Sequence, residues 1–203
     1  MKLLLLSRGI TNNKIRKETK KLLDQDPKKC KAVVITTKKH KKHILRQTRK
    51  LKRELLKVKI KNTDFVHISK KTSYKKFKDY DLMYVGGGNT FYILDALRKS
   101  GLDRIISKFA KSGKLYLGAS AGALLVCPSI EMAGWSKYIY DDNEINLKNL
   151  RGLNIIDCVI MPHVNAGVRR ELPGFRKRSK YKIVDITDAQ AAVFTGRNKF
   201  YKI

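Results

Sequence analysis

Ser120 lies within a short glycine- and alanine-rich segment whose pattern favours a nucleophile. Residues 114–126 have the sequence KLYLGASAGALLV, in which a short apolar run precedes Gly118 and a longer one follows Gly122. This G-x-S-x-G pattern is typical of a strand–turn–helix elbow, which raises the serine Oγ above a sheet and leaves room only for small neighbours. The N-terminus of the following helix would favour a developing oxyanion. Ser120 is therefore the candidate nucleophile; the alternative is a Gly/Ala-rich turn with a surface serine.

A second glycine-rich segment, YVGGGNTFYIL at residues 84–94, ends another expected strand. Consecutive glycines allow backbone N–H groups to converge on an anion, so Gly87 and Gly88 are candidates for one half of an oxyanion hole. Asn89 is placed to cap the helix behind them. A phosphate-binding loop is the competing interpretation, but no Gly-Lys-Ser/Thr follows, and Phe91 stands where G-x-G-x-x-G needs its third glycine. A close-packed turn without a ligand is the other alternative.

A serine nucleophile needs a base, and His163 is the best placed of the four histidines because it follows an apolar run. In parallel α/β sheets, functional sites gather at the carboxyl ends of strands, which puts His163 on the same edge as Ser120. The alternative is a structural histidine. An acid should orient the base; Asp188 is the first choice, and Asp141 and Asp142 are alternatives. No HExxH or His/Cys/Asp cluster predicts a metal site, and no cofactor is expected.

Short apolar runs alternate with amphipathic segments along the chain. This alternation predicts an α/β protein with a mainly parallel sheet and helices on both faces. Residues 155–161 are expected to form a central strand, and the three C-terminal strands to close the sheet. We expect one domain over residues 1–203, since no linker or repeat interrupts the pattern. Strands are expected at residues 2–6, 32–36, 64–68, 82–85, 115–117, 155–161, 182–186, 191–195 and 200–203, and helices at 13–23, 41–56, 90–99 and 102–111.

The composition combines one sizeable core with a large positive charge. Hydrophobic residues make up 42% of the 203 residues, while 46 Lys and Arg against 17 Asp and Glu give a net charge of +29. Such a charge favours polyanionic partners. Residues 38–61 hold twelve Lys or Arg and one acid, Glu54. Two interpretations are open for this segment: a surface that binds nucleic acid or another polyanion, and a solvated helix face. Because it has no aromatic residues, it offers no platform on which single-stranded bases could stack.

A cytoplasmic location is expected from three features of the sequence. The N-terminal MKLLLLSRGI has too short an apolar run for a signal peptide. No stretch approaches the roughly 18 apolar residues that span a bilayer, so no membrane association is expected. The three cysteines, Cys30, Cys127 and Cys158, are far apart and odd in number, which fits neither a disulfide framework nor a zinc site.

Four segments together resemble the dipeptidase E/cyanophycinase family of serine peptidases. They are MKLLLLS at residues 1–7, VGGGNTFYIL at 85–94, GASAGALLVCPSIE at 118–131 and IMPHV at 160–164. The resemblance implies a flavodoxin-like sheet related to class I glutamine amidotransferases, with a serine in place of their cysteine. It implies Ser120 as nucleophile, His163 as base and Asp188 as acid. The resemblance further implies an oxyanion hole made by the N–H groups of Gly88 and Ala121.

The chain departs from this family in two places. Dipeptidase E carries an aspartate shortly after the elbow, where this chain has Ala133, Gly134 and Trp135. Residues 164–187 form a short segment rich in arginine, and in dipeptidase E that region helps to select an N-terminal aspartate. Because the arginine fork pairs well with a carboxylate, Arg170 is a candidate for binding an acidic group of the substrate.

We therefore expect a serine exopeptidase that hydrolyses small peptides, including dipeptides with an N-terminal aspartate. Hydrolysis of a β-aspartyl-arginine polymer is a close variant, which the positive charge disfavours. The alternative from another class is a catalytically divergent, amidotransferase-like protein whose basic surface binds RNA or another polyanion. The intact set of Ser120, His163 and glycines favours the enzyme, because a pure binding protein has no need for it.

Overall fold

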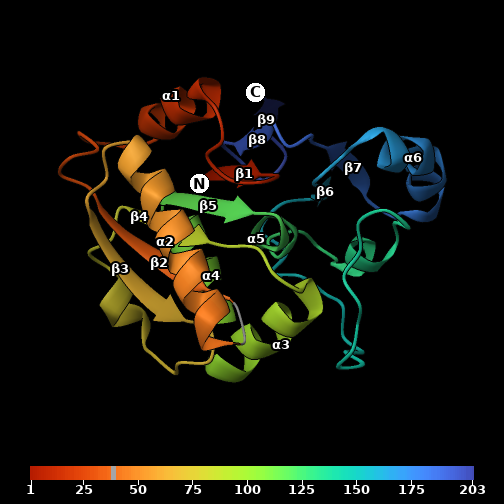
Figure 1. Ribbon diagram of the computed structural model, residues 1–203, viewed down its shortest axis with the longest axis horizontal. Coiled ribbons are helices and arrows are strands. Elements are labelled where there is room, and N and C mark those ends of the chain that lie inside the picture. Colours follow the sequence, from red (N-terminus) through yellow and green to blue (C-terminus); the bar gives the residue numbers. More distant parts are fainter. Residues whose placement is uncertain (38–39) are drawn as a thin grey trace.

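A seven-stranded sheet forms the centre of the computed structural model, which describes residues 1–37 and 40–203 (Figure 1). Five of these described strands run parallel, and the last two are antiparallel to their neighbours. In spatial order the strands are β3 (Asn62–His67), β2 (Lys31–Thr36), β4 (Leu82–Val85), β5 (Leu115–Ala119), β1 (Lys2–Leu6), β8 (Ala191–Phe194) and β9 (Phe200–Lys202).

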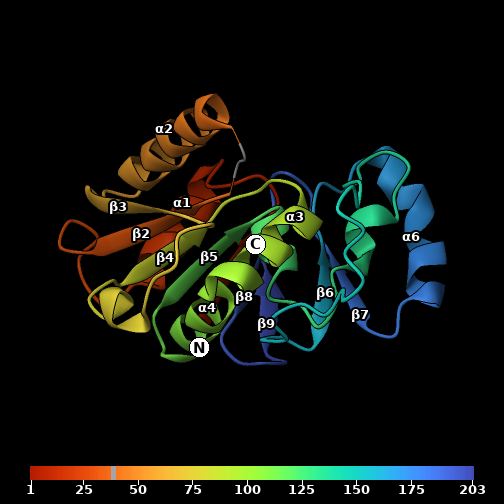
Figure 2. The same ribbon diagram turned by 90° about the horizontal axis from the view of Figure 1, so that it is seen from below.

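Helices cover both faces of this sheet (Figure 2). On one face lie α1 (Asn13–Lys21) and α2 (Lys41–Lys57), and on the other lie α3 (Thr90–Ser100), α4 (Leu102–Lys111) and the short α5 (Ala121–Leu124). Leu4 and Leu6 of β1 pack toward α1 and α2, whereas Leu3 and Leu5 pack on the opposite face. A strand buried on both faces needs apolar residues throughout, which explains the run of four leucines. The predicted fold class is confirmed.

Residues 155–161 do not form the expected central strand. Within them only β6 (Cys158–Met161) is a strand, and it pairs in parallel with β7 (Lys182–Asp185) in a separate two-stranded sheet. The N–H groups of Ile155 and Ile156 donate instead to the carbonyl of Val126, at 2.8 and 3.3 Å. The apolar run correctly indicates burial, but burial here comes from packing against α5 and the segment after it. Of the three strands expected to close the main sheet, β8 and β9 do so and β7 does not.

The sequence pattern did not predict α6 (Ala166–Arg178), which lies beside the two-stranded sheet (Figures 1 and 2). Asn165 caps this helix by accepting a hydrogen bond from the Val168 N–H at 3.0 Å. Val168, Leu172 and Phe175 form its buried face at helical spacing, which the many arginines and the internal Pro173 obscure. None of the described helices, α6 included, is long and apolar enough to cross a membrane.

Gly122→Ala is expected to destabilise the contact between α5 and β4. A Cβ on Gly122 would lie 2.3 Å from the carbonyl oxygen of Val85, a backbone atom that cannot rotate away. We expect the free energy of unfolding to fall by about 1–3 kcal/mol, as in overpacked interiors, when measured by urea denaturation. The matched control is Gly174→Ala in α6, where a Cβ meets no atom within 4 Å. Equal stability of the two variants would contradict this contact.

Candidate active site

Ser120 stands at the carboxyl end of β5, directly before α5. Its backbone angles are φ 54° and ψ −116°, a positive-φ conformation that is strained for a serine. The turn is held by a hydrogen bond of 2.9 Å from the Ser120 N–H to the Leu6 carbonyl. A Cβ on Gly118 would lie 2.4 Å from the Gly122 carbonyl oxygen, which explains the small residues of the motif. The predicted strand–turn–helix geometry is confirmed.

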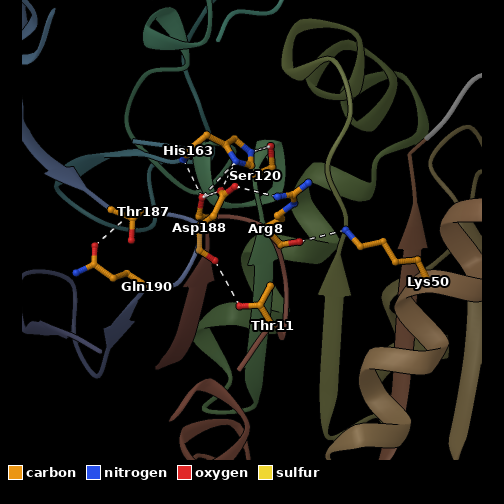
Figure 3. Close-up of polar contacts among 9 residues, drawn as sticks. Arg8, Thr11, Lys50, Ser120, His163, Thr187, Asp188 and Gln190 are labelled. Carbon is orange, nitrogen blue, oxygen red and sulfur yellow. Dashed lines mark hydrogen bonds and ion pairs between the residues drawn. The ribbon is translucent and has the colours of Figure 1, made fainter. Parts of the chain in front are cut away.

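His163 and Asp188 lie in line with this serine (Figure 3). The Nε2 of His163 is 2.9 Å from the Oγ of Ser120, and its Nδ1 is 2.7 Å from Oδ1 of Asp188. His163 follows β6, and Asp188 lies between β7 and β8. The structure therefore brings the three predicted residues together, although β6 lies outside the main sheet.

The two alternative acids do not contact His163. Oδ2 of Asp141 accepts hydrogen bonds from the N–H and the Oγ1 hydroxyl of Thr90, at 2.9 and 2.6 Å, and so binds the start of α3. Asp142 uses its backbone carbonyl to accept a hydrogen bond from the side chain of Asn89. Asn89 caps α3 as predicted, through a bond from the Tyr92 N–H.

Ser7, which sequence reasoning missed, joins this group from the end of β1. Its buried Oγ donates to Oδ1 of Asp188 at 2.7 Å and accepts the backbone N–H of His163 at 2.7 Å. Arg8 adds a weaker contact, with its Nη1 3.3 Å from Oδ2 of Asp188. Ser7 follows a strand directly, as Ser120 does. Because functional residues gather at the carboxyl ends of parallel strands, this position was the signal that could have identified Ser7.

These contacts set the protonation of the site. Burial opposes ionisation of Asp188, but hydrogen bonds from Ser7 and His163, the charge that His163 carries when protonated and the charge of Arg8 outweigh it and hold the Asp188 pKa below the usual 3.8. An ionised carboxylate only accepts hydrogen bonds, so the proton of the neutral imidazole lies on Nδ1. Nε2 is then free to accept the Ser120 hydroxyl proton, which is the arrangement a general base requires.

The Gly87–Gly88 peptide lies against the serine and is fixed from behind. A Cβ on Gly87 would be 3.0 Å from the Cβ of Ser120. The Gly87 carbonyl accepts hydrogen bonds from the Thr37 hydroxyl at 2.6 Å and from Nε2 of Gln47 at 2.8 Å. In a planar trans peptide the next N–H points opposite to the carbonyl, so these bonds also fix the direction of the Gly88 N–H.

Gln47 is the second residue that sequence reasoning missed. Its side chain is buried in α2, where Oε1 accepts the Thr37 N–H at 2.8 Å and Nε2 donates to the Thr37 hydroxyl at 2.8 Å. Gln47 lies four residues before Leu51 and eight before Leu55, so helical spacing places it on the same buried face. A neutral polar residue at such a position was the signal that could have identified it. Ala121 is the first residue of α5, so its N–H has no partner within that helix and is the other candidate oxyanion donor.

Two cavities include both Ser120 and His163 in their linings. One, of about 290 Å³, has a lining that includes the apolar Leu124, Met132 and Ile139 and the carboxylate of Asp141. The other, of about 700 Å³, extends from Gly87 and Gly88 toward α2. Arg170 lines neither cavity, because it lies on the exposed side of α6. The structure thus does not bring this predicted substrate-binding residue to the site.

The cysteines do not compete with Ser120 as nucleophiles. Burial raises the pKa of Cys30 to about 11 and that of Cys158 to about 12, and it also raises that of the fully buried Cys127. A thiol with so high a pKa is protonated near neutral pH and unreactive. Across the described part of the chain, no group of three or more His, Cys, Asp or Glu side chains is placed to hold a metal ion.

The chain matches the model of peptidase family S51 over residues 3–199. An uncharacterized peptidase of Listeria monocytogenes serovar 1/2a is 39% identical over 90 residues, which cover 44% of this chain and 43% of that protein. Peptidase E of Escherichia coli O1:K1 is 37% identical over 83 residues, covering 41% of this chain and 34% of that protein. The chain thus spans less than half the length of these curated relatives in the matched regions.

Two solved structures share the fold. A "Putative Peptidase E Protein" from Listeria monocytogenes EGD-e has a TM-score of 0.74 at 22% identity, covering 100% of this chain and 97% of its own. A peptidase from an acI-B1 Actinobacterium has a TM-score of 0.70 at 18% identity, covering 100% and 86%. At these identities the likeness concerns the fold alone.

Fold and site together define an α/β domain with a serine, a histidine and an aspartate in one hydrogen-bonded line. The match over nearly all of its length shows that the chain belongs to peptidase family S51. The resemblance to the dipeptidase E/cyanophycinase family is confirmed by this match and by the relatives named peptidase E.

Ser7→Ala is expected to slow the reaction of Ser120 with a fluorophosphonate probe by about tenfold, because Asp188 and the His163 N–H each lose a partner. Mass spectrometry of the labelled protein over time measures this rate without knowledge of a substrate. The control is Ser100→Ala, another buried serine, whose Oγ bonds only at the junction of α3 and α4, to the Leu97 carbonyl and the Leu102 N–H. A wild-type labelling rate in folded Ser7→Ala would refute the positioning role of Ser7.

Gln47→Leu is expected to slow the same labelling by about tenfold, because the Gly88 N–H loses its fixed direction toward the developing oxyanion. The matched variant Thr37→Ser keeps the hydroxyl that donates to the Gly87 carbonyl, so it should be labelled at nearly the wild-type rate. If both variants react as fast as wild type while remaining folded, the Gly87–Gly88 peptide is not an oxyanion donor set by α2.

Proposed function

We propose that this chain is a serine peptidase that cleaves small peptides with Ser120 as nucleophile, His163 as general base and Asp188 as the orienting acid. The observation that carries the proposal is the unbroken line of contacts, 2.7 Å from Asp188 to His163 and 2.9 Å from His163 to Ser120. Membership of peptidase family S51 and the names of the relatives support the reaction class.

The reaction proceeds in two halves. Nε2 of His163 takes the hydroxyl proton while Oγ of Ser120 bonds to the carbonyl carbon of the scissile peptide. The N–H groups of Gly88 and Ala121 stabilise the resulting oxyanion. Collapse of this intermediate breaks the C–N bond, and His163 returns the proton to the departing amine. A water molecule, deprotonated by His163, then hydrolyses the acyl ester and restores the serine.

The fixed position of His163 favours this mechanism over a passive site. Asp188 is ionised at neutral pH and accepts a hydrogen bond from the Nδ1–H group, which stabilises the imidazolium formed during attack. Nη1 of the neighbouring Arg8 is 3.3 Å from Oδ2 of Asp188, and the Arg8 side chain is 66% exposed, so its charge is not buried beside the histidine.

More specifically, we propose that the chain is an exopeptidase that releases the N-terminal residue of short peptides, including dipeptides with an N-terminal aspartate. The smaller cavity of about 290 Å³ is of a size suited to one residue on the acyl side of the scissile bond. Arg170 lies away from this cavity and is not included as a determinant for aspartate.

The deciding experiment incubates a mixed dipeptide library with wild type and with Ser120→Ala and follows each peptide by mass spectrometry. We expect wild type to deplete a subset of the library and Ser120→Ala to deplete none, with a loss of at least about 10⁴-fold. Circular dichroism should show that the variant keeps its fold. Depletion by both proteins, or a Ser120→Ala variant as active as wild type, would rule out the proposed nucleophile.

A further inference from the structure

The larger cavity at Ser120 is lined by positive charge. We call it the basic groove; it has a volume of about 700 Å³ and includes both Ser120 and His163 in its lining. No Asp or Glu is among the described residues that line it. Its basic lining residues are Arg8, His43, Arg46, Lys50 and Arg53.

Helix α2 supplies most of these charges and is fixed against the site. Gln47 points inward and binds the Gly87 carbonyl, as described above. Residues three or four positions away on a helix lie on the same side, so His43 and Lys50 flank Gln47 along the groove. The bond between Gln47 and Gly87 therefore sets the distance of the basic side chains from Ser120 as well as the direction of the Gly88 N–H.

Much of this charge has no acidic partner. Within the described part of the chain, Arg46 forms no ion pair, and Lys50 reaches only Oε1 of Glu54 at 3.8 Å and the carbonyl of Arg8 at 3.2 Å. Arg53 donates its Nε to a backbone carbonyl of the same helix. A cleft lined by one sign of charge concentrates ligands of the opposite sign.

We propose that the basic groove binds carboxylates of the leaving-group segment of the substrate, so that the preferred substrates are acidic oligopeptides rather than neutral ones. This inference rests on the proposed function. An enzyme that releases an N-terminal residue places one residue on the acyl side, and the longer part of the peptide needs the larger cavity. From His43 to Arg53 the helix rises about 15 Å, which matches four to five extended residues at about 3.3 Å each.

A peptide fits the groove better than a nucleic acid does. No Phe, Tyr or Trp is found among the described residues that line it, so successive bases would find no ring to stack on. The groove also ends at Ser120 and His163, whose chemistry suits a carbonyl carbon. Acidic side chains on an extended strand can meet several of the cations at once.

The test uses two peptides built on a dipeptide that wild type cleaves, extended at the C-terminus by four Glu or by four Gln. The groove variant is Arg46→Gln, Lys50→Gln and Arg53→Gln combined. The matched control combines Lys42→Gln, Lys52→Gln and Lys57→Gln, exposed residues of the same helix that do not line the groove. We expect wild type and control to favour the Glu peptide by about tenfold in kcat/KM, and the groove variant to lose this preference.

A binding measurement separates this inference from the proposed function. Fluorescence anisotropy with Ser120→Ala needs no turnover, and it should show about tenfold tighter binding of the Glu peptide than of the Gln peptide, weakening as salt is added. If no peptide is cleaved by wild type but this binding preference persists and depends on the groove, the peptidase proposal fails and the acidic-peptide site stands.

Three results would overturn the inference. The first is equal binding of the Glu and Gln peptides. The second is an equal loss of preference in the groove and control variants, which would assign the effect to net charge alone. The third is tighter, groove-dependent binding of a ten-nucleotide single-stranded RNA than of the Glu peptide, which would assign the groove to nucleic acid.

Discussion

The end of β1 is the point on which the whole site depends. Leu6 accepts the N–H of Ser120 at 2.9 Å, and the next residue, Ser7, accepts the N–H of His163 at 2.7 Å. Both held residues have positive φ, 54° for Ser120 and 59° for His163, a conformation that costs about 1–3 kcal/mol each for residues other than glycine. One buried strand end therefore stabilises both strained residues and sets the distance between them.

This constraint matters because the histidine does not come from the main sheet. Ser120 is fixed by the pairing of β5 with β1, whereas His163 follows β6 in the two-stranded sheet. Strand pairing alone thus cannot set the contact between them. The bonds of Ser7 to His163 and Asp188 join the two sheets beside the contact between His163 and Ser120. Asp188 in turn precedes β8, which pairs with the other edge of β1.

What the sequence predicts well here is local. The elbow around Ser120 and the cap at Asn89 follow from residue types at fixed spacing, and they appear as expected. His163 and Asp188 could be predicted because both follow strands. The prediction that the strand before His163 belongs to the main sheet was nevertheless wrong. Membership of one sheet or another depends on distant pairing that an apolar run does not encode. The same limit explains Arg170, since a charged segment does not reveal which side of an unrecognised helix faces the site.

Helix α2 illustrates how one element serves two roles that its composition conceals. The twelve Lys and Arg of residues 38–61 suggest a solvated or polyanion-binding surface, yet the same segment contains Gln47, the buried side chain that fixes the glycine loop. A buried amide whose oxygen and nitrogen both form hydrogen bonds is held in one orientation, because any rotation leaves a polar group unpaired. Arg46 and Lys50, on either side of Gln47, are consequently placed relative to Ser120 by a buried interaction. Charge that composition alone assigns to the surface is thereby part of the site.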